Sequence, residues 1–342
     1  MLCRWTRGAA TGVVALALTG GLVSAAQAAP AVEESSLRVS VGTVQPVAAS
    51  QARAAVPCER GKAYYTRYQS CVVLGATVTL LRNGRPVGNA KFDITHKMTL
   101  KNKSLKWSET VKIGKARLVN ASGVTVGLKV TCGGKCKPTS QFPRGRKLGR
   151  EFSGKVNYQD KVAKLKKDNT SAKYVFTFTK PGYAPGGFNY RSVPFRCDDT
   201  FWNRQHTRRT LSPGCAFHTY IPVMTTMRSL PQIAQNIRNV QSGGGHYGRI
   251  GSGKPLHREG YEQAIRDNRE KVCPRGQTPP RPGLSCDEYP FASTREGGHH
   301  VAADSRGTAW VPEDEQRKQG GRIQTFQKKE RIVHRDAFWV SV

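Results

Sequence analysis

Two adjacent carboxylates, Asp287 and Glu288, stand directly after Cys286 and before a short apolar run that begins at Pro290. A third carboxylate, Glu296, follows at the glycine turn that closes this run. Carboxylates at the end of a short strand are suited to hold a hard divalent cation or to activate a water molecule. The same short pattern also occurs in solvated turns, so the motif alone leaves a purely structural role open.

The charge of the chain indicates an anionic partner. The formal net charge is +32, and residues 57–220 hold 32 Lys and Arg against 8 Asp and Glu, a net of +24. Residues 221–342 hold 19 against 13, a net of +6. A charge this uneven predicts binding of DNA, RNA or the anionic teichoic acids of a cell wall. The alternative is a basic surface that only maintains solubility.

The N-terminus has the pattern of a secretory signal peptide. Arg4 and Arg7 form a positive segment, Val13–Val23 is mostly apolar, and Ala26-Gln27-Ala28 is a small-residue cleavage site. We therefore expect residues 1–28 to be removed and the protein to be secreted and extracellular. The apolar segment is too short for a membrane span. The residues do not indicate an oligomeric state.

Eight cysteines remain after the signal peptide, an even number that fits an oxidising compartment. The Cys-Gly-Gly-Lys-Cys loop could bind a metal or act as a redox pair, but no second cysteine pair stands nearby. A small disulfide loop is therefore the preferred interpretation. Proximity in the sequence predicts the pairs Cys58–Cys71, Cys132–Cys136, Cys197–Cys215 and Cys273–Cys286.

The chain divides into four segments by composition. After the signal peptide, residues 29–56 lack aromatic residues and are predicted to be a flexible linker. Residues 57–220 contain short alternating runs with turn signals such as Asn83-Gly84, which predict a basic, all-β domain with a sandwich or barrel-like fold. Since all candidate catalytic residues lie beyond this domain, we expect it to hold a polyanion separately from catalysis.

Residues 221–342 mix helices and strands, so the fold class of the whole chain is predicted to be α+β. Helices are expected over 229–237 and 261–272, with strands over 287–294 and 308–311. A helical segment is expected to begin at 313, where acidic residues suit a helix N-terminus. Two strands and a helix that hold a cation between carboxylates form the plan of a one-metal phosphodiesterase site.

This series of motifs resembles the NucA/NucB family of secreted, sporulation-type deoxyribonucleases, in the actinobacterial form with an N-terminal extension. The resemblance covers about residues 225–342, and residues 29–220 resemble no family that we can name. The motifs that carry it are Leu230-Pro231, Ala234–Ile237, Pro255–Arg258, Asn268-Arg269, Cys286–Thr294, Glu296–Gly298, Trp310–Pro312, Glu315, Gln319–Gly321 and Phe338–Val340.

The resemblance implies a compact endonuclease related to the ββα-metal nucleases, which hydrolyses DNA with a divalent metal, Mg²⁺ or Mn²⁺. It implies that Asp287 is the general base, where many ββα-metal enzymes have a histidine. Glu315 is the implied helix carboxylate that holds the cation, and Gln316 follows it with an amide oxygen. Glu288 and Glu296 are candidates to ligate the metal, and Glu288 is also a candidate to orient Asp287.

The reaction also requires a positive group for the charge that develops on the phosphate. Arg295, His299 and Arg306 are candidates for this role. His299 and His300 are also candidates to ligate the metal, but adjacent residues on a strand point to opposite faces, so we expect at most one of them to reach the ion. A surface position for both is the preferred interpretation.

The chain departs from the family pattern at two positions. Asn236 stands where many members have histidine, and Gln316 stands where they tend to have asparagine. An alternative function is therefore a catalytically inactive secreted protein that binds DNA or teichoic acid. A hydrolase with Ser293 as nucleophile is a weaker alternative, because the glycine pattern of a nucleophile elbow is missing.

Overall fold

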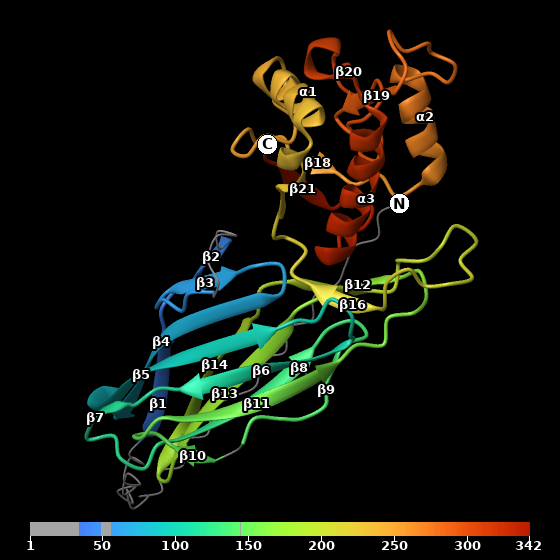
Figure 1. The fold of residues 1–342 in the computed structure, drawn as a ribbon. Helices are drawn as coiled ribbons and strands as arrows, with labels where there is room; N and C mark the ends of the chain where they lie inside the picture. Colours follow the sequence, from blue (N-terminus) through green and yellow to red (C-terminus); the bar gives the residue numbers. More distant parts are fainter. Residues whose placement is uncertain (1–33, 49–55, 144) are drawn as a thin grey trace, which may run out of the picture. The chain divides into compact units, whose positions relative to one another are not determined.

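Most strands upstream of residue 220 join one large curled sheet (Figure 1). The computed structural model describes residues 34–48, 56–143 and 145–342, so the predicted signal peptide lies outside the described residues. The hydrogen-bonded order of the main path is β10-β8-β13-β14-β1-β4-β5-β6-β11-β9. Off this path, β3 pairs with β4, β2 pairs with β3, and β7 pairs with β5. The strands are β1 Ser35–Val41, β2 Gln45–Ala48, β3 Lys62–Tyr65, β4 Gln69–Arg82, β5 Arg85–Thr99, β6 Lys106–Ile113, β7 Arg117–Val119, β8 Thr125–Cys132, β9 Lys137–Pro138, β10 Arg146–Lys147, β11 Phe152–Gln159, β13 Ala172–Lys180 and β14 Tyr183–Arg191.

Alternation of apolar and polar residues explains why these segments are strands. In β13, Tyr174, Phe176 and Phe178 are buried on one face, and the residues between them are more exposed. β4 and β5 form the longest hairpin, which turns at Asn83 and Gly84 with φ angles of 48° and 75°. Positive φ at both positions defines the turn for which Asn-Gly is preferred, as the sequence predicts.

The segment predicted as a flexible linker is partly a strand. β1 pairs antiparallel with β4 from Ser35 to Val41, and Leu37 is 6% exposed. The prediction used the composition of residues 29–56 and did not consider that Leu37, Val39 and Val41 alternate with polar residues, which is the pattern of a half-buried strand. The linker prediction is therefore wrong for β1 and β2, whereas residues 29–33 and 49–55 lie outside the described residues.

The remaining elements form smaller sheets and the helices. β12, β15 and β16 make a three-stranded sheet, β17, β21 and β18 make another, and β19 pairs with β20. Together with the large sheet they give a mixed α+β fold. The bounds are β12 Lys167–Thr170, β15 Phe195–Asp198, β16 Gly214–Ala216, β17 Val223–Met224, α1 Pro231–Ser242, β18 Leu256–His257, α2 Glu262–Val272, β19 Leu284–Tyr289, β20 Gly307–Pro312, α3 Glu313–Lys329 and β21 Ala337–Val340, with short 3₁₀ helices at Thr226–Ser229 and Ala303–Ser305.

Two buried apolar clusters lie within residues 34–342, which form one compact unit. The first cluster runs from Leu37 to Phe217, and the second runs from Met224 to Val340. The predicted boundary at residue 220 lies between them. Below, residues 34–220 are called the β-rich region and residues 221–342 the C-terminal region. None of the helices in the described part of the chain is long and apolar enough to cross a membrane.

The four predicted disulfides are confirmed. Cys58–Cys71, Cys132–Cys136, Cys197–Cys215 and Cys273–Cys286 have Cα–Cα separations of 4.0–5.7 Å. Each bridge closes a short loop, with sequence separations of 4 to 18 residues. The prediction from sequence proximity was correct because each disulfide joins two cysteines that are close in the chain and lie in the same region.

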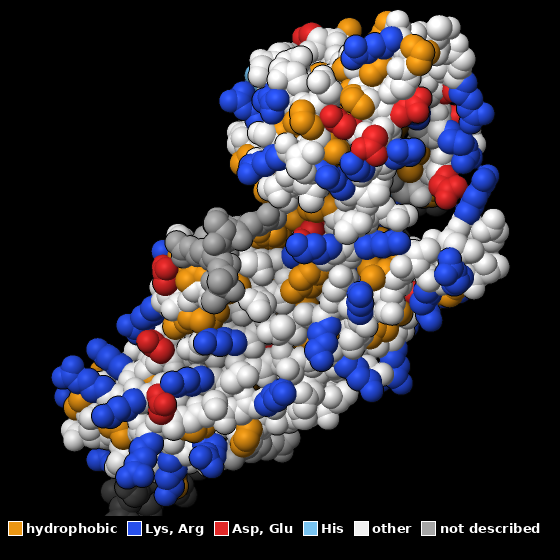
Figure 2. Space-filling view, viewed as in Figure 1, with side chains coloured by type: hydrophobic (Ala, Val, Ile, Leu, Met, Phe, Trp, Pro, Cys, Tyr) orange, Lys and Arg blue, Asp and Glu red, His pale blue; other side chains and the backbone are white. Residues whose placement is uncertain are grey.

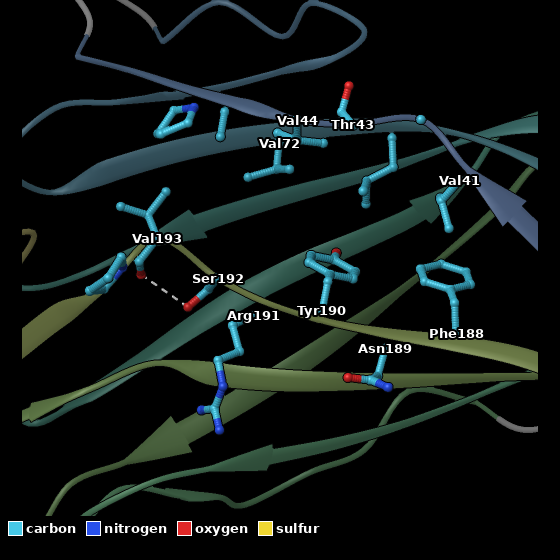
Figure 3. A pocket seen from close by; sticks show the side chains of 15 residues that line it. Val41, Thr43, Val44, Val72, Phe188, Asn189, Tyr190, Arg191, Ser192 and Val193 are labelled. Atoms are coloured by element: carbon cyan, nitrogen blue, oxygen red, sulfur yellow. Dashed lines mark hydrogen bonds between the residues drawn. The ribbon is translucent and has the colours of Figure 1, made fainter.

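The surface of the β-rich region is basic on the face shown in Figure 2, where Lys and Arg side chains (blue) are spread over the sheet and Asp and Glu (red) are few. A cavity of about 500 Å³ also opens in this region, beside β1 and the end of β14. In Figure 3 the rings of Phe188 and Tyr190 point toward Val41, Val44 and Val72, whereas Arg191 points away. This lining is mostly apolar and lacks carboxylates, so the cavity is not the candidate site.

Candidate functional site

The candidate site is built on β19, which carries Asp287 and Glu288. β19 pairs antiparallel with β20, and α3 follows β20 directly. Because consecutive strand residues point to opposite faces, the two carboxylates have different surroundings. β19 ends at Tyr289, since Pro290 lacks the N–H that a ladder requires, so the strand is shorter than the predicted 287–294.

Asp287 is fully buried between α1 and α3. Its exposed fraction is 0%, and its Oδ2 accepts a hydrogen bond from Nδ2 of Asn236 on α1 at 2.8 Å. Its Oδ1 accepts one from Nε2 of Gln319 on α3 at 2.7 Å. Burial raises the pKa of Asp287 to about 6, although the two amides and the nearby Arg269 favour the charged form. Asp287 is thus a carboxylate that changes its protonation state near neutral pH.

Gln316 is the partly exposed neighbour of Asp287. With its amide nitrogen toward the carboxylate, it donates to Oδ1 of Asp287 at 3.2 Å and accepts from Nη1 of Arg269 at 3.2 Å. Gln316 therefore connects Asp287 with the partly exposed Arg269.

Glu288 lies on the opposite face and pairs with Arg269 of α2. Nη1 of Arg269 donates to Oε2 of Glu288 at 2.5 Å, and its Nη2 donates to the carbonyl of Cys286 at 2.9 Å. Glu288 is 7% exposed, and burial raises its pKa to about 7 even though Arg269 opposes the shift. Desolvation therefore outweighs the ion pair, and Glu288 also titrates near neutral pH.

A small cavity of about 280 Å³ opens on the Glu288 side of β19. Its lining includes Glu288, His299, Arg306 and Lys271. The structure thus brings two of the candidate positive groups, His299 and Arg306, to Glu288. Arg306 is fixed there because its Nη1 donates to the carbonyl of Val301 at 2.9 Å.

Glu296 and Arg295, two further predicted site residues, contact His257 and not Asp287. Glu296 accepts hydrogen bonds from the backbone N–H of His257 at 2.8 Å and contacts its Nδ1 at 2.8 Å. Arg295 is exposed, and its backbone N–H donates to the carbonyl of His257 at 2.8 Å. These contacts fasten the turn after β19 to β18, and no contact of either side chain with Asp287 is found in the described part of the chain.

Glu315 contacts the start of α1. Its Oε2 accepts hydrogen bonds from the backbone N–H groups of Gln232 at 3.1 Å and Ile233 at 3.2 Å. The N-cap residue of α1, Leu230, makes no side-chain cap, so Glu315 satisfies these donors from another helix. Its role as a metal ligand stays a prediction.

Sequence reasoning assigned no role to Asn236, Arg269 or Gln319, although all three stand in the motifs that carry the family resemblance. A polar residue within an apolar helix face could have marked Asn236, which lies between the buried Ile233 and Ile237 on α1. The pair Asn268-Arg269 was another signal. Asn268 donates to the carbonyls of Ala292 and Thr294 at 3.0 and 3.1 Å and so fixes the segment after β19.

The residues around Asp287 fit a divalent cation only in part. Among the described residues, no group of three or more His, Cys, Asp or Glu could hold a metal ion. Asp287 and Gln316 offer one carboxylate and one amide, and the amide presents oxygen instead of nitrogen after a simple rotation. Mg²⁺ retains several waters and can be bound through one or two carboxylates, but both oxygens of Asp287 already accept hydrogen bonds, so the fit is partial.

The site thus combines two paired strands, the helix that follows them and two buried carboxylates. Residues 251–341 match the family model of Deoxyribonuclease NucA/NucB, which confirms the predicted family for these residues, and such a family implies DNA as the substrate. The match includes Asp287, Glu288 and α3, whereas Asn236 lies before it. No curated protein and no solved structure matches the chain. The four disulfides fit an extracellular nuclease.

The raised pKa values predict how stability depends on pH. In EDTA, the contribution of Asp287 to the free energy of unfolding should be fully present below about pH 4 and lost as pH rises through about 6. Asp287→Asn cannot ionise, so the difference between wild type and this variant should change by on the order of 2–3 kcal/mol between pH 4 and pH 7. Urea unfolding at half-unit pH steps measures it, and a constant difference would contradict the assignment.

Glu315→Gln separates the two roles of Glu315. If it caps α1, loss of the charge at the helix start should lower the free energy of unfolding by roughly 0.5–2 kcal/mol. The cation concentration for half-maximal activity should then stay the same. Glu313→Gln, in the same helical turn, is the control. An unchanged stability with at least a tenfold higher cation requirement would instead identify Glu315 as a metal ligand.

Proposed function

We propose that the C-terminal region is a metal-dependent endonuclease that hydrolyses phosphodiester bonds of DNA, with Asp287 as the general base. The observation that carries this proposal is the raised pKa of a buried carboxylate, about 6, within a matched deoxyribonuclease region. A base with a pKa near the working pH is present in the required form and accepts protons well. An ordinary aspartate, at about 3.9, is a weaker base.

In this reaction Asp287 takes a proton from water, and the water oxygen forms a bond to phosphorus. The bond from phosphorus to the leaving oxygen breaks, and that oxygen keeps the electron pair and takes a proton from solvent water. The ion pair of Arg269 and Glu288 fixes the Cys286 carbonyl and the adjacent backbone, so it orients Asp287. His299 and Arg306 line the cavity beside Glu288, on the opposite face of β19 from Asp287. The proposed positive group for the developing charge is therefore Arg269, which contacts Gln316 and acts on Asp287.

Gln316 is the proposed ligand that holds Mg²⁺ or Mn²⁺ beside Asp287, with waters to complete the coordination. Such a cation neutralises charge on the non-bridging phosphate oxygens when bound. Glu315 holds the backbone of α1 through Oε2, so Oε1 is the oxygen through which it could join the coordination. The surplus of basic residues in the β-rich region supports binding of long DNA, RNA or cell-wall polymers by that region.

One observation favours a second function, the binding of DNA without cleavage. Both carboxylate oxygens of Asp287 accept hydrogen bonds from amides, and the residue has no exposed surface. Cleavage would therefore require the side chains around Asp287 to move and admit water, whereas binding to the basic surface would not.

Supercoiled plasmid separates these functions. We expect nicking and then degradation with Mg²⁺ or Mn²⁺, and no cleavage in EDTA. Asp287→Asn keeps the shape of the side chain but removes the base, so the cleavage rate should fall by on the order of 10²–10⁴. DNA affinity should change little.

Asp267→Asn, an exposed position on α2, is the matched control and should keep wild-type activity. Intact plasmid at high concentrations of wild-type protein and metal would support the binding function. A rate for Asp287→Asn within about twofold of wild type would remove Asp287 from the mechanism.

A further inference from the structure

The C-terminal end of α3 is held by side chains of the β-rich region. Asn102 donates through Nδ2 to the last two carbonyls of the helix, at 3.0 and 3.1 Å. The hydroxyl of Tyr68 donates to the final carbonyl at 2.6 Å, and Nε of Arg67 donates to the next one at 2.5 Å. The last carbonyls of an α-helix have no partners within the helix. The β-rich region therefore supplies the hydrogen bonds that α3 cannot make itself.

Arg331 occupies a position at this helix end where glycine is usual. Its N–H donates to the carbonyl of Lys328 at 3.4 Å, and the N–H of Ile332 donates to that of Gln327 at 2.8 Å. These two bonds define a Schellman motif, in which the residue at Arg331 must adopt a left-handed conformation. Its φ is 46°, which is unfavourable for a residue with a Cβ atom. An arginine here requires a compensating interaction.

The compensating interaction is a buried ion pair with Asp198 of the β-rich region. Arg331 is 0% exposed, and its Nε and Nη2 donate to the two carboxylate oxygens of Asp198, each at 2.9 Å. Its Nη1 donates to the carbonyls of Asn102 and Ser212 at 2.5 and 3.0 Å. A two-pronged arginine–carboxylate pair is strong and fixes geometry as well as distance.

A second buried pair joins the same network. Asp336 accepts from Nη2 of Arg67 at 2.8 Å and from Nη1 of Arg196 at 2.6 Å. Burial alone would favour the neutral acid, but Arg196 and Arg67 hold the pKa of Asp336 below its ordinary value. Both arginines also donate to the carbonyl of Arg331, at 2.8 and 3.0 Å. The network thus holds the end of α3 through both the side chain and the backbone carbonyl of Arg331.

The other end of α3 carries Gln316 and Gln319, which contact Asp287. A helix is a stiff element, so a shift or rotation at Arg331 would displace these amides from the carboxylate. We propose that the β-rich region is part of the nuclease machinery, and that Arg331, held by Asp198, is a positioning residue for α3. The inference rests on the proposed nuclease function. It replaces the expectation that the β-rich region acts separately from catalysis.

The test uses full-length protein with Arg331→Gly. Glycine favours the left-handed conformation, so this change relieves the backbone while it removes the contact with Asp198. We expect hydrogen exchange of the α3 amides to rise by at least about tenfold, because a buried ion pair is lost. The kcat for DNA cleavage should fall at least about tenfold, with KM within about threefold. Compared with Arg331→Gly, Arg331→Lys should show slower hydrogen exchange in α3 and a higher kcat, both closer to wild type.

Arg335→Gly is the matched control, because Arg335 is an exposed arginine with φ of 73° only four residues away. It should leave exchange in α3 and kcat within about twofold of wild type. If Arg331→Gly behaves like Arg335→Gly, the inference is overturned. If Arg331→Gly does not fold, Tyr68→Phe and Asn102→Ala replace it as tests of the attachment of α3. In each, we expect hydrogen exchange of the α3 amides to be about fivefold faster, because the side chain no longer donates to the helix end.

The exchange measurement needs no DNA, so it distinguishes the two hypotheses. Faster exchange in Arg331→Gly together with an inactive wild-type protein would support the attachment of α3 and reject the proposed nuclease function. Cleavage by the wild type, together with unchanged hydrogen exchange and kcat in Arg331→Gly, Tyr68→Phe and Asn102→Ala, would support the nuclease function and reject Arg331 as a positioning residue.

Discussion

The C-terminal region depends on the burial of one carboxylate. Asp287 has no exposed surface, and α1 and α3 each supply an amide to one of its oxygens. A buried charge is costly unless hydrogen-bond donors surround it. The positions of α1 and α3 are therefore constrained by polar groups as well as by the apolar cluster from Met224 to Val340. A buried carboxylate with neutral amide partners, and without a direct ion pair, keeps a pKa suited to proton transfer.

Charges in this protein fall into two groups. Most Lys and Arg residues of the β-rich region lie on the surface, where screening by salt makes each one weak and their sum important. The arginines at positions 67, 196 and 331 are buried and bind carboxylates at fixed distances. The first group suits attraction of a polyanion of any sequence, and the second group determines geometry.

Local signals in the sequence were sufficient for the disulfides, the Asn83-Gly84 turn, the helices α1, α2 and α3, and the β19–β20 pair, because each depends on residues close in the chain. The family motifs also located Asp287 and Glu288 correctly on one strand. The direction of the Glu315 side chain could not be derived, because a carboxylate in a first helical turn can serve a metal or another helix equally well. Asn102, Asp198 and Arg331 are far apart in the sequence, and only the tertiary fold brings them together.

The Cys273–Cys286 bridge has a consequence for the loop that it closes. The bridge joins the end of α2 to β19, and the carbonyl of Gly283 accepts a hydrogen bond from the N–H of Glu313 at 3.0 Å. Arg269 and Glu288 link the same two elements independently of the loop. Residues 274–282 therefore carry little of the connection between α2 and β19. This loop is the place where the C-terminal region can accept an inserted peptide, a label or a proteolytic nick while the neighbouring strand keeps its register.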